Sequence, residues 1–375
     1  MMLLAHIDVV SASAADWSVE PFKLIEKDGY FYGRDVGDNK FMASAFVANL
    51  IRYKQEGLKP ERDLILVLET DEEILDADAM GIQWLLKNHR ALIDAEFALN
   101  EGGGVGLAKG KPLSVNLQTS EKVSVNFQLE VKNPGGHGSL PVRDNAIYRL
   151  AEGLARLSRY EFPVQLNETT RVFFQRRAPQ VEPQQGADMR ALIAQPADAA
   201  VAAAAAARLS ASASYNAQLR TTCVATMLGG GHAINALPQT ARAGVNCRVM
   251  PGESVDEVLK TLVRVVADEQ IVITTTSTSV LSAPSPLNAE LMRVIERHAA
   301  EFWPGAPVIP VMSAGATDGS FLRNAGIPTY GHSGLASDIA DNRAHGRDER
   351  VLVKSYFEGL EYQYRLVKAL STSAN

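Results

Sequence analysis

Carboxylates and histidines are concentrated at five places in the sequence, and these side chains are common ligands of divalent metal ions. The five places are His6-Ile7-Asp8, Asp38, Asp71-Glu72-Glu73, Glu101 and His345. Two histidines, one shared aspartate and two glutamates form a sensible mixed nitrogen and oxygen ligand set for a pair of Zn²⁺ ions. The adjacent negative charges at 71–73 would repel one another unless a cation offset them.

Each feature also has an ordinary structural interpretation. Asp38 could simply be the N-cap of the helix that follows it. A run of acids after a strand is usually a solvated turn, and a single histidine is more often structural or exposed than a ligand. His89, for example, is interpreted as a surface helix residue. The five features together are harder to explain by structure alone.

The elements predicted around these residues place them at one edge of a sheet. Residues 64–68 form a continuous apolar run, which is typical of a strand buried on both faces, and residues 97–99 predict another short strand. Helical spacing predicts one helix that ends at Glu56-Gly57 and a second that begins after Gly81. Strands that alternate with helices indicate an α/β fold with a mainly parallel sheet, in which ligands bind at the carboxyl ends of the strands.

The pattern changes from about residue 120 onward. Apolar and polar residues alternate strictly over 123–131 and again over 243–249, and an amphipathic helix at 255–266 precedes a strand at 271–275. This predicts a separate α+β layer inserted into the first domain. The Ala-rich stretch 199–207 predicts a surface helix within an insertion. From residue 285 the α/β pattern returns.

Composition narrows the possible classes of protein. The chain has 375 residues, 37 basic and 43 acidic side chains and a net charge of -6, so it has no basic excess with which to bind nucleic acid. It contains no run of about 18 apolar residues, so no membrane span is expected. Two cysteines, Cys223 and Cys247, cannot make a disulfide framework, and we expect both to be small apolar packing residues.

The sequence resembles the M20 family of metallopeptidases, which contains glutamate carboxypeptidase, aminoacylase and carnosine-hydrolysing enzymes. The matching segments occur in the family's order across essentially the whole chain. They are His6-x-Asp8, Gly37-Asp38-Asn39-Lys40, Asp71-Glu72-Glu73, Asn100-Glu101-Gly102, Gly135-Gly136-His137-Gly138, Gly315-Ala316-Thr317-Asp318 and Ala344-His345-Gly346.

The resemblance implies two zinc ions per chain, with Co²⁺ or Mn²⁺ as possible substitutes. His6 and Glu101 would bind one ion, Glu73 and His345 would bind the other, and Asp38 would bridge them. A pair of metal ions lowers the pKa of a water molecule between them, which makes that water a nucleophile.

The resemblance also implies roles for residues that bind no metal. Asp8 would hold the His6 ring in its metal-binding orientation, and Glu72 would be the general base. His137 would reach an active site from the inserted layer, in a partner subunit, and steady an oxyanion. Asn235 and Arg248 would bind substrate, the latter through a substrate carboxylate.

The domain organisation follows from the same comparison. A discontinuous catalytic domain would comprise residues 1–118 and 283–375. Residues 119–282 would form a ferredoxin-like lid and dimerisation domain with an Ala-rich insertion near 165–220. Relatives carry further structure before the His-x-Asp strand, so the N-terminus is interpreted as truncated. The location is left open: cytoplasmic as the chain stands, and periplasmic or secreted if a leader is missing upstream.

The expected activity is hydrolysis of an amide bond in a dipeptide, a C-terminal peptide bond or an N-acyl amino acid. Two alternatives remain open, namely a hydrolase of a succinylated or carbamoylated amine and a catalytically silent binding protein. Two departures from the family pattern lie near the predicted bridge. Asp35-Val36 replaces the common Gly-Thr, and Asn39 replaces an aspartate.

Overall fold

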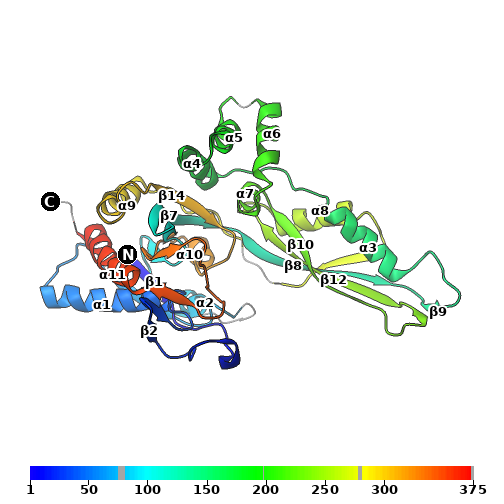
Figure 1. Ribbon diagram of the computed structural model, residues 1–375, viewed down its shortest axis with the longest axis horizontal. Helices are drawn as coiled ribbons and strands as arrows, with labels where there is room; N and C mark the ends of the chain where they lie inside the picture. Colours follow the sequence, from blue (N-terminus) through cyan, green and yellow to red (C-terminus); the bar gives the residue numbers. More distant parts are fainter. Residues whose placement is uncertain (75–80, 197, 278–280, 373–375) are drawn as a thin grey trace.

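The computed structural model describes residues 1–74, 81–196, 198–277 and 281–372. Its two main sheets are well separated along the long axis of the molecule (Figure 1). We call them the large sheet, which has eight strands, and the four-stranded sheet. Within the described residues, no helix combines the length and hydrophobicity needed to cross a bilayer.

The large sheet has the strand order β16-β6-β7-β15-β5-β1-β4, and β14 also pairs with β7. Its strands are β1 (Met2–His6), β4 (Ile65–Glu69), β5 (Ala98–Asn100), β6 (Val105–Ala108), β7 (Lys111–Glu121), β14 (Val308–Ser313), β15 (Thr329–Gly331) and β16 (Ala336–Asp338). Neighbours β4, β1, β5 and β15 run parallel, whereas β7 is antiparallel to β6 and to β15. The predicted α/β fold with a mainly parallel sheet is confirmed.

Strand β1 is buried over its whole length because helices cover both faces of the large sheet. Leu3 and Ala5 pack in a core shared with α1 (Lys40–Glu56), α9 (Ala289–Phe302) and α11 (Val353–Ser371). Met2 and Leu4, on the other face, pack against α2 (Gly81–Asn88) and α10 (Gly319–Asn324). As predicted, α1 ends at Glu56, and Gly57 then takes a left-handed conformation with φ 69°.

Strand β4 differs from its prediction. The apolar run at 64–68 indicated burial on both faces, but Leu68 is 41% exposed and Val67 is the one apolar side chain of β4 that is fully buried. The reason is that, among the described residues, β4 is an edge strand and pairs with β1 alone. An apolar run predicts a strand, but the position of that strand in the sheet depends on long-range pairing.

The four-stranded sheet is antiparallel, with the order β10-β12-β8-β13. Its strands are β8 (Val123–Lys132), β10 (Thr222–Gly230), β12 (Thr240–Val249) and β13 (Ile271–Thr275). Alternate residues of β8 enter a core with α3 (Ala146–Leu157) and α8 (Val255–Val266), so both helices cover the same face. The chain order β8-α3-β10-β12-α8-β13 with this strand order is the ferredoxin-like arrangement expected from the sequence.

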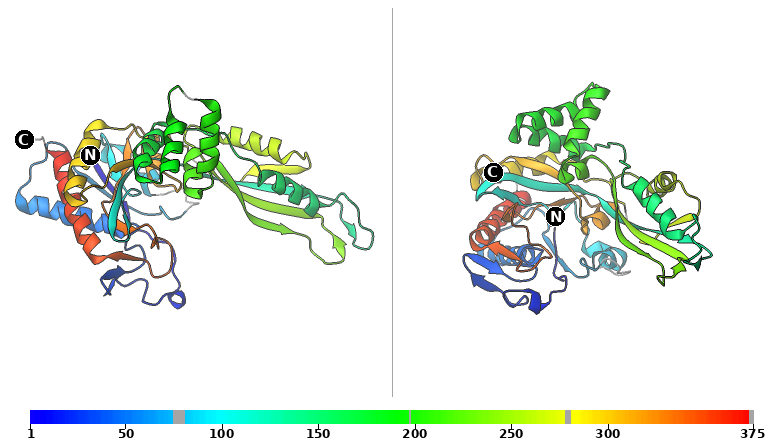
Figure 2. Two further views of the ribbon diagram at one scale, coloured as in Figure 1. Left: turned by 45° about the horizontal axis from the view of Figure 1, so that its top comes forward. Right: turned by 45° about the vertical axis from the view of Figure 1, so that its right-hand side comes forward.

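Helices α4 (Glu168–Arg177), α5 (Pro183–Ile193), α6 (Ala199–Leu209) and α7 (Ala213–Leu219) lie between α3 and β10 in the chain and share an apolar cluster of their own. They lie beside β14 of the large sheet (Figure 2). Arg176 donates a hydrogen bond to the carbonyl oxygen of Val308 over 2.7 Å. Most of the Ala-rich helix α6 is exposed, although Ala205 and Ala206 are buried.

Cys223 and Cys247 form a disulfide, so the expectation that they are unpaired packing residues is wrong. Cys223 lies in β10 and Cys247 in β12, and the two are directly opposite in the antiparallel register. Twenty-four residues separate them in the sequence. Their proximity results from strand pairing, which the spacing of two cysteines does not reveal.

Smaller elements complete the fold. β2 (Ile25–Lys27), β3 (Tyr30–Tyr32) and β17 (Arg350–Leu352) form a three-stranded sheet, and β9 (Gly136–His137) pairs with β11 (Ala236–Leu237). Short 3₁₀ turns occupy Ala14–Asp16, Arg90–Leu92 and Ala178–Gln180. We call β9, β11 and their flanking loops the tip, because they lie at the end of the molecule remote from β1 (Figure 1).

Candidate metal centre

Three neighbouring parallel strands of the large sheet end at the predicted metal ligands. His6 is the last residue of β1, Glu101 follows β5, and the Glu72-Glu73 pair lies in the loop after β4. Asp38 enters from the loop before α1, and His345 from the loop before β17. The carboxyl ends of parallel strands meet at one edge, which explains why residues so far apart in the sequence converge here.

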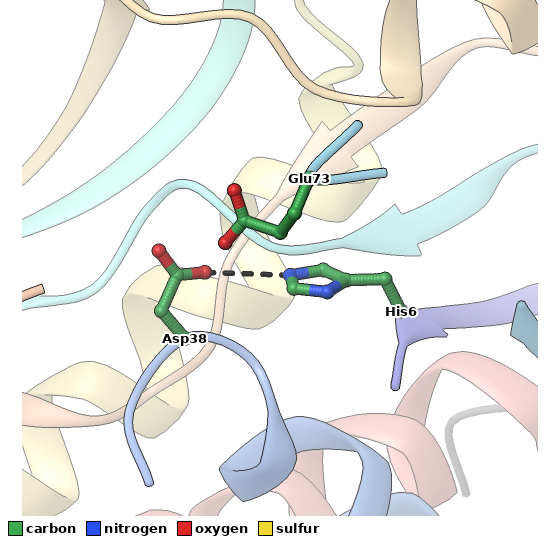
Figure 3. Close-up of side chains that lie close together, drawn as sticks. All are labelled: His6, Asp38 and Glu73. Carbon is green, nitrogen blue, oxygen red and sulfur yellow. Dashed lines mark hydrogen bonds and ion pairs between the residues drawn. The ribbon is translucent and has the colours of Figure 1, made fainter. Parts of the chain in front are cut away.

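The two oxygens of Asp38 face two different histidines. Asp38 Oδ1 lies 3.4 Å from His6 Nε2, the contact drawn in Figure 3, and Asp38 Oδ2 lies 3.2 Å from His345 Nε2. Glu101 Oε2 lies 3.3 Å from His6 Nε2, and Glu73 Oε1 lies 2.8 Å from His345 Nε2. The carboxylate of Asp38 therefore lies between two histidine–glutamate pairs.

This arrangement can hold divalent metal ions. Among the described residues, ligand atoms of His6, Asp38 and Glu73 lie within 4.8 Å of one another, and so do those of His6, Glu72 and Glu101. Imidazole nitrogen and carboxylate oxygen are ligands that suit Zn²⁺, and they also suit other divalent transition metals. The side chains on either side of Asp38 are therefore suitable ligands for the pair of zinc ions that the sequence predicts.

The alternative interpretation of Asp38 as a helix N-cap is wrong. The N-cap of α1 is Asn39, and its side chain makes no capping hydrogen bond. The Asp38 carboxylate instead points to His6, as Figure 3 shows. His89 is also no ligand here: it follows α2, and its ring lies 4.7 Å from that of Trp84.

Asp8 connects the His6 ring to the acidic loop. His6 Nδ1 lies 3.2 Å from the backbone oxygen of Asp8 and 3.5 Å from its Oδ1. The other carboxylate oxygen, Asp8 Oδ2, accepts a hydrogen bond of 3.0 Å from the backbone N–H of Glu73. With Nδ1 held in this way, Nε2 faces the other ligands, and a partner of this kind fixes the tautomer of a metal-binding histidine.

The crowding of acids shifts several pKa values in the metal-free protein. Burial alone would lower the pKa of His6, but hydrogen bonds with Asp38 and Glu101 raise it to about 12. Burial, together with the negative charges of Glu101 and Asp318, raises the pKa of Glu72 to about 10. A bound cation would oppose the rise at Glu72, because positive charge favours the carboxylate form.

A second acidic pair lies behind the centre. Glu69, the last residue of β4, and Asp318, next to α10, are both buried. Burial raises the pKa of Asp318 well above its usual range, and the neighbouring carboxylate of Glu69 adds to the rise. In the sequence, Asp318 stands out only as part of a segment that resembles the family. Glu69 is not indicated at all, because a glutamate at the end of a strand carries no signal of its own.

Asp35 adopts a conformation that favours glycine, with φ 61°. It is fully buried, and neither oxygen of its carboxylate has a hydrogen-bond partner in the part of the chain that the structure describes. Burial and the neighbouring charge of Glu349 raise its pKa to about 8. The structure thus explains the first departure from the family pattern as an aspartate at a glycine-type position, held uncharged by its surroundings at neutral pH.

The predicted residues of the inserted layer lie elsewhere. His137 in β9 and Asn235 beside β11 meet at the tip, where the backbone N–H of Gly138 donates to the Asn235 carbonyl oxygen over 2.7 Å. The tip is remote from β1 (Figure 1), so these two residues do not join the metal centre of their own chain. Arg248 in β12 lies nearer the large sheet and donates to the carbonyl oxygen of Ala314 over 3.4 Å.

Comparison with known proteins identifies relatives of this chain. The N-fatty-acyl-amino acid synthase/hydrolase PM20D1 of Xenopus tropicalis is 30% identical over 384 residues, a match that covers 99% of this chain and 72% of that protein. A metallo-carboxypeptidase of the M20 family from Sulfolobus solfataricus shares the fold with a TM-score of 0.72 at 20% identity, over 98% of this chain and 84% of that one.

A dinuclear metal-binding peptidase of the M20 family from Bacillus subtilis has a TM-score of 0.57 at 12% identity, over 99% of this chain and 81% of that one. The family match extends over nearly the whole chain, from residue 2 to residue 369. The segments that carry the predicted metal ligands all lie inside it. This chain therefore belongs to peptidase family M20/M25/M40 and is a metal-dependent hydrolase of the metallopeptidase and amidohydrolase type.

Proposed function

We propose that this chain is a two-zinc hydrolase that cleaves the amide bond of an N-acyl amino acid, a dipeptide or a C-terminal peptide bond. The observation that supports it most is the carboxylate of Asp38, whose two oxygens face His6 and His345. His6 and Glu101 would hold one ion, and Glu73 and His345 the other. Two bound zinc ions would acidify a water molecule and polarise the substrate carbonyl group.

The chain's own residues would move the proton and orient the ligands. Glu72 would take the proton from the attacking water and return it to the departing amine, which is general base and then general acid catalysis. Its place beside His6 and Glu101 supports that role. Asp8 would keep the ring of His6 in its ligand orientation through the contacts at Nδ1.

Among the three substrate classes, we place N-acyl amino acids first. The supporting observation is the PM20D1 relative, whose name describes an N-fatty-acyl-amino acid synthase/hydrolase and whose match covers 99% of this chain. Amino acids released from such substrates carry a carboxylate, which Arg248 would bind through its guanidinium group. Burial lowers the pKa of Arg248. An arginine side chain is charged in proteins at neutral pH, so it can pair with a carboxylate.

We further propose that residues 1–118 and 283–375 act as the catalytic unit and that residues 119–282 act as its lid and dimerisation unit. Among the described residues, β10 pairs only with β12, so its other edge is open. Met227 and Leu228 in β10 are each 73% exposed. An open apolar edge can pair with its own copy around a twofold axis, which would make a homodimer.

In that dimer, the tip of one subunit would serve the metal centre of the other. His137 would donate a hydrogen bond to the oxyanion that forms at the cleaved carbonyl group, and Asn235 would bind the substrate beside it. Support comes from their shared place at the tip, away from the centre of their own chain.

The test combines metal analysis with a panel of substrates. Elemental analysis should find about two zinc ions per chain, as a two-metal site requires. The zinc-loaded protein should hydrolyse N-acyl amino acids with long acyl chains, N-acetyl amino acids or dipeptides, and a chelator should abolish the activity. A folded protein that binds no zinc and cleaves none of these substrates would overturn the proposal.

A further inference from the structure

A buried ion pair joins the two loops that carry Asp38 and His345. Arg34 lies four residues before Asp38, and Glu349 lies four residues after His345. Arg34 Nη1 donates to Glu349 Oε2 over 2.9 Å, and both side chains are only 3% exposed. The two loops are 315 residues apart in the sequence at this contact.

The Glu349 carboxylate also holds the backbone of the Asp38 loop. Its Oε2 accepts a hydrogen bond of 3.1 Å from the N–H of Asp35, and its Oε1 accepts one of 3.3 Å from the N–H of Gly37. Both oxygens are therefore occupied by the segment that leads into Asp38. Asp35 has φ 61°, so the carboxylate fixes a stretch of backbone that is strained for a non-glycine residue.

Arg34 also contacts the loop that carries His345. Its Nη2 donates to the carbonyl oxygen of His345 over 3.5 Å. Its guanidinium group also lies over the ring of Trp17, 5.0 Å from the ring centre, a cation–π contact that adds to its hydrogen bonds. Arg34 and Glu349 thus hydrogen-bond to the backbone of both loops. Within the described part of the chain, neither makes a hydrogen bond or ion pair with the side chain of Asp38 or of His345.

A buried ion pair is a weak source of stability, because removing both charges from water offsets much of their attraction. A pair that served only to join β3 to β17 could be replaced by apolar packing. Arg34 and Glu349 instead form hydrogen bonds with the backbone of the two loops that carry Asp38 and His345. These hydrogen bonds point to a role in the geometry of the centre.

We infer that Glu349, together with Arg34, is a positioning residue of the metal centre: it sets the separation of Asp38 and His345 and thereby the affinity of the ion bound by Glu73 and His345. The inference rests on the proposed two-metal function. It assigns no contact between Glu349 and a metal ion or a substrate.

The test compares Glu349→Gln with a matched control, Asp188→Asn. The glutamine keeps the size of the side chain but turns one acceptor oxygen into a donor, so it cannot accept all three hydrogen bonds. Asp188 is also buried and binds Arg208 through two hydrogen bonds, but it lies in α5, within the cluster of helices α4–α7. Its variant removes a buried carboxylate charge without altering the loops of the centre.

We expect Glu349→Gln to weaken the binding of one of the two zinc ions by about 10- to 100-fold, the usual effect of losing a residue that supports metal ligands. Zinc affinity is measured by competition with a chelator. The absorption spectrum of the Co²⁺-loaded protein should change as well, since it reports ligand geometry. Asp188→Asn should lower the melting temperature to a similar extent while leaving zinc affinity and the cobalt spectrum unchanged.

Wild-type zinc affinity and an unchanged cobalt spectrum in Glu349→Gln would overturn the inference. If that variant does not fold, Arg34→Lys replaces it, because lysine keeps the charge but cannot reach both Glu349 and the His345 carbonyl oxygen. Wild-type zinc affinity in Arg34→Lys would also overturn the inference. A wild-type protein that binds two zinc ions but hydrolyses no substrate contradicts the proposed function alone. In that case the zinc affinities of wild-type protein and Glu349→Gln still decide whether Glu349 has the positioning role.

Discussion

The metal centre and the tip contrast in how far each is complete within one chain. At the centre, side chains from five separate segments meet at distances of 2.8–3.4 Å. His6 is buried, Asp38, Glu73 and Glu101 are partly buried, and the His345 side chain is 51% exposed. At the tip, His137 and Asn235 lie on a two-stranded ribbon, and both are exposed. The nearest side-chain partner of His137 there is Ser139, whose Oγ lies 2.6 Å from His137 Nδ1.

This difference shows that the two regions depend on different levels of structure. The centre is assembled by parallel strand pairing inside the large sheet, so one folded chain suffices to form it. The tip is held by β9, β11 and the four-stranded sheet, and it presents its residues away from that centre. Under the proposed function, only a second chain completes the site.

The largest expected effect tests the centre. Glu72→Gln should reduce hydrolysis by about 10²–10⁴-fold, because the general base is lost, while zinc content stays at the wild-type value. Activity and elemental analysis are measured on the same sample. Glu152→Gln, at an exposed position of α3, is the matched control and should remain fully active. Loss of zinc from Glu72→Gln would show that Glu72 is a ligand and contradict its assignment as base.

The next effect tests whether the tip acts across subunits. His137→Ala should lower kcat by about 10²–10³-fold, the usual effect of removing an oxyanion donor. An equimolar mixture of His137→Ala and Glu72→Gln subunits should then recover about a quarter of wild-type activity, because about half of the dimers are heterodimers and each heterodimer has one intact site of two. Mixing that restores no activity would mean that His137 serves its own chain or no site at all.

A third prediction tests whether the stability of the four-stranded sheet, which carries the tip, is independent of zinc binding at the metal centre. Replacing both Cys223 and Cys247 by serine should lower the free energy of unfolding by about 3 kcal/mol, from the loop that the disulfide closes. Zinc content should not change, since the disulfide lies in the four-stranded sheet. Thermal unfolding of the variant and of reduced wild-type protein provides the measurement. A drop in zinc content would show that the two regions are energetically coupled.

The smallest effect concerns proton release at the centre. The pKa of His6 is raised to about 12 by Asp38 and Glu101 against the effect of burial, so the metal-free site holds a proton at neutral pH. Zinc binds neutral imidazole and must displace that proton, so zinc affinity should rise about tenfold per pH unit. Competition titrations with a chelator between about pH 6 and 8 measure this slope. An affinity that does not depend on pH would contradict the release of a proton from His6 when zinc binds.

Much of the fold could be predicted because its signals are local. The helix that ends at Gly57, the alternation in β8 and the amphipathic helix α8 each depend on residues a few positions apart. Predictions failed where a distant partner decided the outcome. Leu68 is exposed because β4 lies at a sheet edge, and Cys223 is oxidised because β12 places Cys247 opposite it.

The same division applies to the site. Residue types and motif order singled out His6, Asp38 and His345 as candidates, since metal chemistry restricts ligands to a few side chains. No local pattern indicated Glu69 or Glu349, because each acts through a partner more than 200 residues away in the sequence.

By itself, the sequence determined the class of fold, the chemistry of the donor set and the family. Only the tertiary structure decided that Asp38 faces two histidines, that Glu349 joins two ligand loops and that the tip lies away from its own centre. The physical reason is that residue type and short-range periodicity depend only on residues that are close together in the sequence. Distances between loops are set by strand pairing and packing over hundreds of residues.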